Sequence, residues 1–141
     1  MSRAKKKLPK LVFLSHEHRD RRFVEKVASL LKAQGIKYWY SRSHIGGAQQ
    51  WQDEIGHALN RCDWFLVVLS PRSVKSKWVR REVAYALDKN RYEDKIIPVL
   101  YKVCQWKKRF WPLTVIEFID FTGKFDHGCQ NLLKIWKIRQ N

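Results

Sequence analysis

Cysteine, glycine, proline and acidic residues are all scarce in this sequence, and each scarcity narrows the class of protein. The three cysteines, Cys62, Cys104 and Cys129, are odd in number, lie far apart and form no C-x-x-C pair. This pattern indicates a reduced, intracellular chain without a disulfide framework or a cysteine-based zinc site. Six glycines, four prolines and 45% hydrophobic residues exclude a disordered composition.

The sequence also lacks long apolar runs and the standard phosphate-binding motifs. No run approaches the roughly 20 residues that a membrane span needs, and no apolar segment follows the basic N-terminus as in a signal peptide. We therefore expect a cytoplasmic protein with no membrane contact. There is no G-x-G-x-x-G and no Walker A motif. His16 and His18 could suggest a metal, but no third ligand is evident, so we expect no metal site.

Positive charge dominates, with 29 Lys and Arg against 13 Asp and Glu and a formal net charge of +16. Such a field attracts anions in general and does not identify the ligand. Residues 1–10 are predicted to be a basic, flexible arm, which could serve as a nuclear address or an RNA tether but is more simply a solvated tail. Lys107, Lys108 and Arg109 lie between two tryptophans and could bind nucleic acid; an ordinary basic surface is the simpler interpretation.

Strand and helix patterns alternate along a chain whose 141 residues suit a single core. Apolar runs predict strands at residues 11–14, 36–40, 64–69 and 96–100, and a weaker fifth strand at 115–119. Pro98 argues that the fourth strand lies near an edge of the sheet or that the proline lies near a strand end. Asp20 is placed to begin the first helix and Gly35 to end it. The closing helix is predicted from Leu132, Leu133, Ile135 and Trp136.

This alternation predicts an α/β fold, a flavodoxin-like three-layer sandwich with a five-stranded, mostly parallel sheet and helices on both faces. With strand order 2-1-3-4-5, a ligand binds where the order reverses, between the first and third strands. The loops expected to meet there are residues 15–19, 41–50 and 70–77.

The helix after the third strand carries two side-chain stripes. Val79, Val83, Ala86 and Leu87 form an apolar stripe that is predicted to face the sheet. Trp78, Glu82 and Tyr85 form an adjacent stripe at spacings of four and three residues, so these side chains can meet. An aromatic plane beside a carboxylate suits a flat, cationic or ribose-bearing ligand. Glu82 has no cation three or four residues away, which weakens the alternative that it is an ordinary surface charge.

Several motifs follow one another along the chain: FLSH at 13–16, WFLVVLS at 64–70, SKWVRRE at 76–82, FWPL at 110–113 and FID at 118–120. By the order and spacing of these motifs, the chain resembles the TIR (Toll/interleukin-1 receptor) domain family over about residues 10–138. The resemblance implies the flavodoxin-like fold. In the enzymatic TIR class, which cleaves NAD⁺ at the nicotinamide–ribose bond, the glutamate of a W-x-x-x-E pattern is catalytic, and Trp78 and Glu82 match that pattern.

The resemblance further implies that members with this tryptophan often release a cyclic ADP-ribose isomer. Glu82 is accordingly predicted to be catalytic, with NAD⁺ as substrate rather than cofactor. The other residues predicted to contact the substrate are Trp78, Ser15, His16, Ser43, Gly46, Gly47 and Tyr85. Residues 41–50 correspond to the mobile loop of the family, which lies over the active site and at the assembly surface.

The sequence departs from the family at that loop. Receptor-type members carry an Arg-Asp-x-x-Pro-Gly run, whereas residues 41–50 here read SRSHIGGAQQ, which lowers the case for a receptor-adaptor role. The hypothesis we favour is an NAD⁺ hydrolase or cyclase that self-associates, acts in antiphage or immune signalling, and works with a fused or separate sensor. The alternatives are a non-enzymatic TIR–TIR interaction module and, on charge alone, a nucleic-acid or cyclic-nucleotide processing protein.

Overall fold

Five parallel strands form the central sheet of this protein, in the order β2-β1-β3-β4-β5. The computed structural model describes residues 8–40 and 48–138, and only the backbone of residues 48–51. The strands are β1 (Val12–Ser15), β2 (Tyr38–Trp39), β3 (Trp64–Leu69), β4 (Ile96–Leu100) and β5 (Ile119–Asp120). This order confirms the predicted flavodoxin-like arrangement, in which β1 and β3 flank the position where the strand order reverses.

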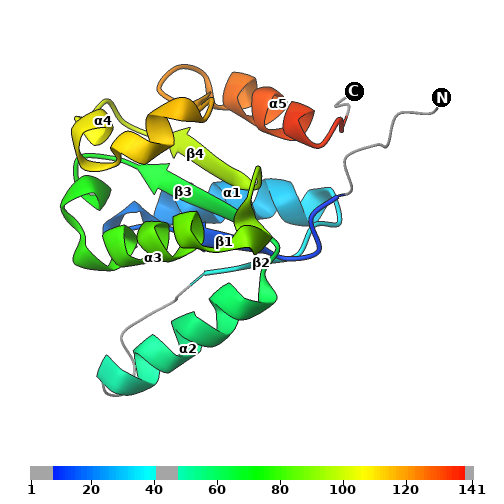
Figure 1. Cartoon of the computed structure of the whole chain (residues 1–141). Coiled ribbons are helices and arrows are strands. Elements are labelled where there is room, and N and C mark those ends of the chain that lie inside the picture. The colour runs from blue at the N-terminus through cyan, green and yellow to red at the C-terminus, as the bar shows by residue number, and fades with distance from the viewer. Residues whose placement is uncertain (1–7, 41–47, 139–141) are drawn as a thin grey trace.

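Helices cover both faces of the sheet (Figure 1). One face packs against α1 (Arg21–Ala33) and α5 (Phe125–Ile135). The other packs against α2 (Ala48–Arg61), α3 (Lys77–Asp88) and α4 (Trp106–Arg109). Short 3₁₀ turns join these elements: η1 (His18–Asp20), η2 (Ser73–Lys75), η3 (Asn90–Tyr92) and η4 (Trp111–Val115).

The alternation of side chains along β1 decides which residue meets which helix. Val12 and Leu14 belong to the core under α1 and α5, whereas Phe13 belongs to the core under α2 and α3. Because side chains alternate with a period of two, Ser15 points to the same face as Phe13. The last residue of β1 is thereby directed at α3.

Local signals set both ends of α1 at the predicted residues, and a serine cap that was not predicted begins α3. Gly35 has a positive φ of 74°, a conformation that glycine adopts without steric cost, and α1 ends just before it. Asp20 occupies the first capping position of α1, but its side chain makes no capping hydrogen bond. The Ser76 side chain caps α3 by accepting a hydrogen bond from the Val79 N–H.

The predicted fifth strand at residues 115–119 was wrong in position. Residues up to Val115 form η4, in which Pro112 lies within the first two positions, and β5 contains only Ile119 and Asp120. Val115 is 87% exposed, so an apolar residue here does not report a buried strand. Apolar character alone misplaced the strand, because a proline-initiated 3₁₀ turn competes for the same residues.

Smaller differences concern three other elements. Leu87 was predicted to face the sheet but is exposed at the end of α3. The second strand is confined to Tyr38 and Trp39, and α2 begins at Ala48, within the segment predicted as loop. Pro98 lies in β4, which has neighbours on both sides, but β5 pairs only with the two residues that follow Pro98. The proline therefore has a strand partner on the β3 side alone. Among the described residues, no helix has the length and apolar character needed to cross a lipid bilayer.

Candidate functional site

The candidate site lies where β1 ends against the middle of α3. Ser15 closes β1, and Glu82 lies on α3 two turns after the Ser76 cap. Both side chains are buried, with exposed fractions of 1% and 7%. The helix holds Glu82 in this place because Val79, Val83 and Ala86 pack into the core on the same side.

A single short hydrogen bond joins the two residues. The Ser15 hydroxyl donates to Oε1 of Glu82 over 2.6 Å. Within the described residues Glu82 makes no ion pair, so the carboxyl group has a polar partner but no balancing charge. Burial raises the pKa of Glu82 to about 7, although the Ser15 hydrogen bond acts in the opposite direction. The group is thus poised between its neutral and charged forms near physiological pH, as functional carboxyls often are.

His16 follows Ser15 and is neutral at this pH. Its Nδ1 lies 3.3 Å from the carbonyl oxygen of Leu14, and its ring meets the ring of Tyr40 edge-on at 5.6 Å. Burial lowers the pKa of His16 to about 4. Its Nε2 is buried and has no hydrogen-bond partner among the described residues. The imidazole next to the Ser15–Glu82 pair is therefore an uncharged group and supplies no counterion to Glu82.

Trp78 lies one helical turn before Glu82, nearer the carboxyl ends of the strands. It is half-buried and packs against the core between the sheet and α3. The guanidinium carbon of Arg81 lies 5.1 Å from the centre of its ring. Sequence reasoning passed over Arg81, although its spacing of three residues from Trp78 was a usable signal.

Tyr85 is turned toward α2. Its hydroxyl donates to Oδ1 of Asn60 over 2.5 Å, and the Lys89 amine lies 5.0 Å from its ring centre. Of the residues predicted to meet on this helix, the structure thus brings Glu82 to Ser15 and joins Tyr85 to a different helix.

The remaining predicted site residues, Ser43, Gly46 and Gly47, lie outside the described residues. No group of three histidine, cysteine, aspartate or glutamate side chains that could hold a metal ion occurs in residues 8–40 and 48–138.

Asp20 is a second buried carboxyl group, and its sequence position indicated only a helix cap. Its Oδ2 accepts a hydrogen bond of 2.5 Å from the Ser70 hydroxyl, at the end of β3. Three further hydrogen bonds join Ser70 to Ser73. The Ser70 N–H donates to the Ser73 hydroxyl, the Ser73 N–H donates to Oγ of Ser70, and the Ser73 hydroxyl donates to the Ser70 carbonyl oxygen. This network joins η1 to the turn after β3 and frames the strand edge beside the Ser15–Glu82 pair.

Comparison with known proteins agrees with this architecture. A family model described as "TIR domain" matches residues 12–133, which is most of the chain. Two curated relatives have similar sequences. An NAD(+) hydrolase of Paracoccus denitrificans is 29% identical over 133 residues, and a probable 2′ cyclic ADP-D-ribose synthase of Methanobrevibacter olleyae is 26% identical over 91 residues. These alignments include 90% and 64% of this chain but only 44% and 27% of the relatives. The chain therefore spans less than half the length of either.

Solved structures show the same fold. The TIR domain of a Toll-related receptor from Hydra magnipapillata superposes with a TM-score of 0.72 at 20% identity, covering 90% of this chain and 98% of that one. The TIR domains of the activated Roq1 resistosome superpose with a TM-score of 0.67, also at 20% identity, covering 89% and 98%. At this identity the likeness establishes the fold and leaves the chemistry to the residues of this chain.

Proposed function

Since the chain belongs to the TIR domain family, we propose that it cleaves NAD⁺ between nicotinamide and ribose, with Glu82 as the catalytic carboxylate. The observation that carries the proposal is the buried Glu82 carboxyl, bonded to Ser15 and without a counterion among the described residues. Two relatives named for NAD⁺ hydrolysis and cyclic ADP-ribose synthesis support the substrate. NAD⁺ is then the substrate, and no separate cofactor takes part.

One carboxylate is sufficient for this reaction. Most glycosidases need a second carboxyl group to protonate the leaving oxygen. In NAD⁺ the bond between the ribose C1′ and the pyridinium nitrogen breaks with its electron pair moving to that nitrogen, so nicotinamide leaves as a neutral molecule. The ribose becomes an oxocarbenium cation, which a carboxylate in a water-poor site stabilises. Water then attacks C1′ and releases a proton, or another group of the same molecule attacks and closes a ring.

The buried position of Glu82 suits a cationic substrate. In the free protein, burial holds its pKa at about 7, so a large fraction of the carboxyl groups is neutral. A pyridinium or oxocarbenium charge nearby favours the ionised form. Glu82 therefore becomes a full carboxylate when the positive charge of the substrate arrives.

Several finer features belong to the same proposal. Trp78 stacks on a ring of the substrate and, by excluding water, favours ring closure over hydrolysis. Self-association of TIR domains completes the site, for which the assembled TIR domains of the Roq1 resistosome are a structural precedent. Signalling in defence, with a sensor protein or domain, is the biological setting we propose. Residues 1–10 are proposed to be a basic arm outside the TIR domain.

The test is nicotinamide release from NAD⁺ by concentrated protein, measured by chromatography with mass spectrometry of the other product. We expect Glu82→Gln to lower the rate by about 10²–10³-fold, as loss of a charge-stabilising group does. Asp88→Asn is the matched control, because it neutralises the other carboxyl group of α3 at an exposed position. The control is expected to retain the wild-type rate.

Equal rates for wild type and Glu82→Gln would refute the catalytic role. Absence of turnover in both, combined with TIR–TIR binding that survives Glu82→Gln, would favour the interaction-module alternative.

A further inference from the structure

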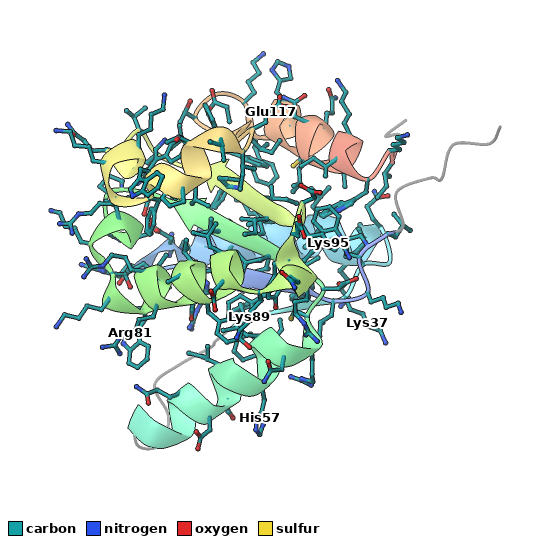
Figure 2. All side chains as sticks on the ribbon, in the orientation of Figure 1. Lys37, His57, Arg81, Lys89, Lys95 and Glu117 are labelled. Atoms are coloured by element: carbon teal, nitrogen blue, oxygen red, sulfur yellow. The ribbon has the colours of Figure 1, made fainter. Side chains whose placement is uncertain are left out.

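Arg81 adds a cation to the rim of the proposed site without taking part in the core. It is exposed on α3, and its guanidinium carbon lies 5.1 Å from the ring centre of the half-buried Trp78. Figure 2 shows the labelled Arg81 side chain projecting outward from α3. The residue after it is Glu82, so the ring, the guanidinium and the buried carboxyl group come from two consecutive turns of one helix.

The N–H groups of the Arg81 guanidinium are available as hydrogen-bond donors. Among the described residues Arg81 has no salt bridge, and no hydrogen bond of its side chain is found. Stacking on a ring uses the flat face of the guanidinium and leaves its N–H groups, which lie in the plane, free to bind a ligand. Those donors match the paired oxygens of a phosphate in a fork geometry.

The surrounding charge also favours an anion. Residues 71–87 contain five cations, Arg72, Lys75, Lys77, Arg80 and Arg81, and a single acidic residue, the buried Glu82. The other acid of α3, Asp88, lies seven residues beyond Arg81 and pairs with Lys89 at 3.9 Å, so it does not compete for Arg81. A second cation–ring pair, Lys89 over Tyr85 at 5.0 Å, lies at the other end of α3 and is turned toward α2. It offers an internal comparison in which the same interaction is directed at α2 rather than at the end of β1.

We propose that Arg81 is a specificity-determining residue that binds the pyrophosphate of a dinucleotide while its guanidinium stays over the ring of Trp78. This inference rests on the proposed function and names the part of the substrate that the carboxylate does not handle. With Glu82 at the ribose carbon and Arg81 at the rim, the site selects a pyrophosphate-bearing molecule over a nucleoside.

The test compares ligands with and without the pyrophosphate by isothermal titration calorimetry on the full chain. We expect Arg81→Ala to weaken ADP-ribose binding by roughly tenfold or more, as loss of a charge-assisted bond does, and to leave the weak binding of adenosine unchanged. The ADP-ribose affinity of Arg81→Lys is expected to lie between those of the wild type and Arg81→Ala, because lysine keeps the positive charge and lacks the planar fork of donors. Steady-state kinetics should show a raised KM for NAD⁺ with kcat within about twofold.

Two control variants separate this role from simpler effects. Arg80→Ala removes a neighbouring charge, and Lys89→Ala removes the other cation–ring pair of the same helix. Both are expected to bind ADP-ribose as the wild type does.

Three results would overturn the proposal: equal ADP-ribose affinity for wild type and Arg81→Ala, an equal loss in Arg80→Ala, or no measurable ADP-ribose binding to the wild type. If NAD⁺ is cleaved with an unchanged KM in Arg81→Ala, this inference fails and the proposed function stands. If NAD⁺ is not cleaved but ADP-ribose binding depends on Arg81, the proposed function fails and the binding role of Arg81 stands.

Discussion

Two buried carboxyl groups lie near the carboxyl ends of β1 and β3, and they have opposite surroundings. Asp20 and Glu82 are 5% and 7% exposed, and each accepts a short hydrogen bond from a serine hydroxyl. Burial raises the pKa of both. The hydroxyl that serves Asp20 belongs to Ser70, which exchanges further bonds with Ser73. Asp20 also has charged neighbours: the negative charge of Glu17 raises its pKa further, whereas the positive charges of Arg72 and Lys102 favour its ionised form.

Glu82 has the Ser15 hydroxyl and no described cation. A buried carboxyl group that is tied into a hydrogen-bond network with cations nearby stabilises a fold, whereas one without a balancing charge costs stability and is commonly retained for function. The comparison assigns Asp20 to the frame of the site and Glu82 to its chemistry. The predictions below test that assignment through stability and pH dependence.

The largest of these effects is expected in the pH dependence of stability. The folded protein keeps a proton on Glu82 up to about pH 7, whereas the unfolded chain releases it near 4.5. Between these values the folded state binds more protons, so the free energy of unfolding falls as pH rises. The shift corresponds to about 3 kcal/mol, all of it lost by about pH 8.

Glu82→Gln removes this contribution. We therefore expect urea denaturation to show that the variant loses less stability than the wild type between pH 5 and pH 8. If the free energy of unfolding changed with pH by the same amount in both proteins, the raised pKa of the buried Glu82 carboxyl would be contradicted.

Asp20→Ala is expected to lower the free energy of unfolding by about 2 kcal/mol at pH 7. The substitution leaves the buried Ser70 hydroxyl without its acceptor, and such orphaned groups typically cost 1–3 kcal/mol. Chemical denaturation measures the loss, and nicotinamide release at a temperature where the variant is folded measures activity. A variant that is as stable as the wild type but inactive would show that Asp20 takes part in the reaction, which would contradict its assignment to the frame of the site.

Ser15→Ala is expected to produce the smallest effect, a displaced pH–rate profile. The Ser15 hydroxyl lowers the pKa of Glu82, so its removal raises that pKa further. The rising limb of kcat/KM against pH should move to higher pH by roughly half to one unit, the equivalent of one hydrogen bond. Ser76→Ala is the control: it removes the α3 cap, costs about 1 kcal/mol of stability and should leave the profile in place.

Sequence patterns alone predicted most of the fold. The buried runs that became β1, β3 and β4 and the glycine that ends α1 follow from local signals, and the parallel sheet follows from the alternation of strands and helices. The strand order came with the flavodoxin-like arrangement, which the TIR resemblance also implies, and the structure confirms it. The failures fell on short or exposed segments. Within residues 115–119, Val115 and Phe118 stayed at the surface, and only tertiary pairing with Val99 and Leu100 selected Ile119 and Asp120 as the strand.

The candidate site divides in the same way. Helical spacing alone placed Trp78 and Glu82 on successive turns of one helix, because a helix fixes its own side-chain geometry; the same spacing could have pointed to Arg81 but was not used. The partner of Glu82 could not be read from spacing, since Ser15 is 67 residues away and reaches α3 only because β1 ends beneath it. The same holds for the bond from Tyr85 to α2 and for the pairing of Asp20 with Ser70. The sequence by itself determined most of the helices and strands and pointed to Glu82 as the catalytic candidate. Tertiary packing decided how deeply Glu82 and Asp20 are buried and which hydrogen-bond partners they have. Both properties set the pKa of a carboxyl group, and both depend on residues that are distant in the chain.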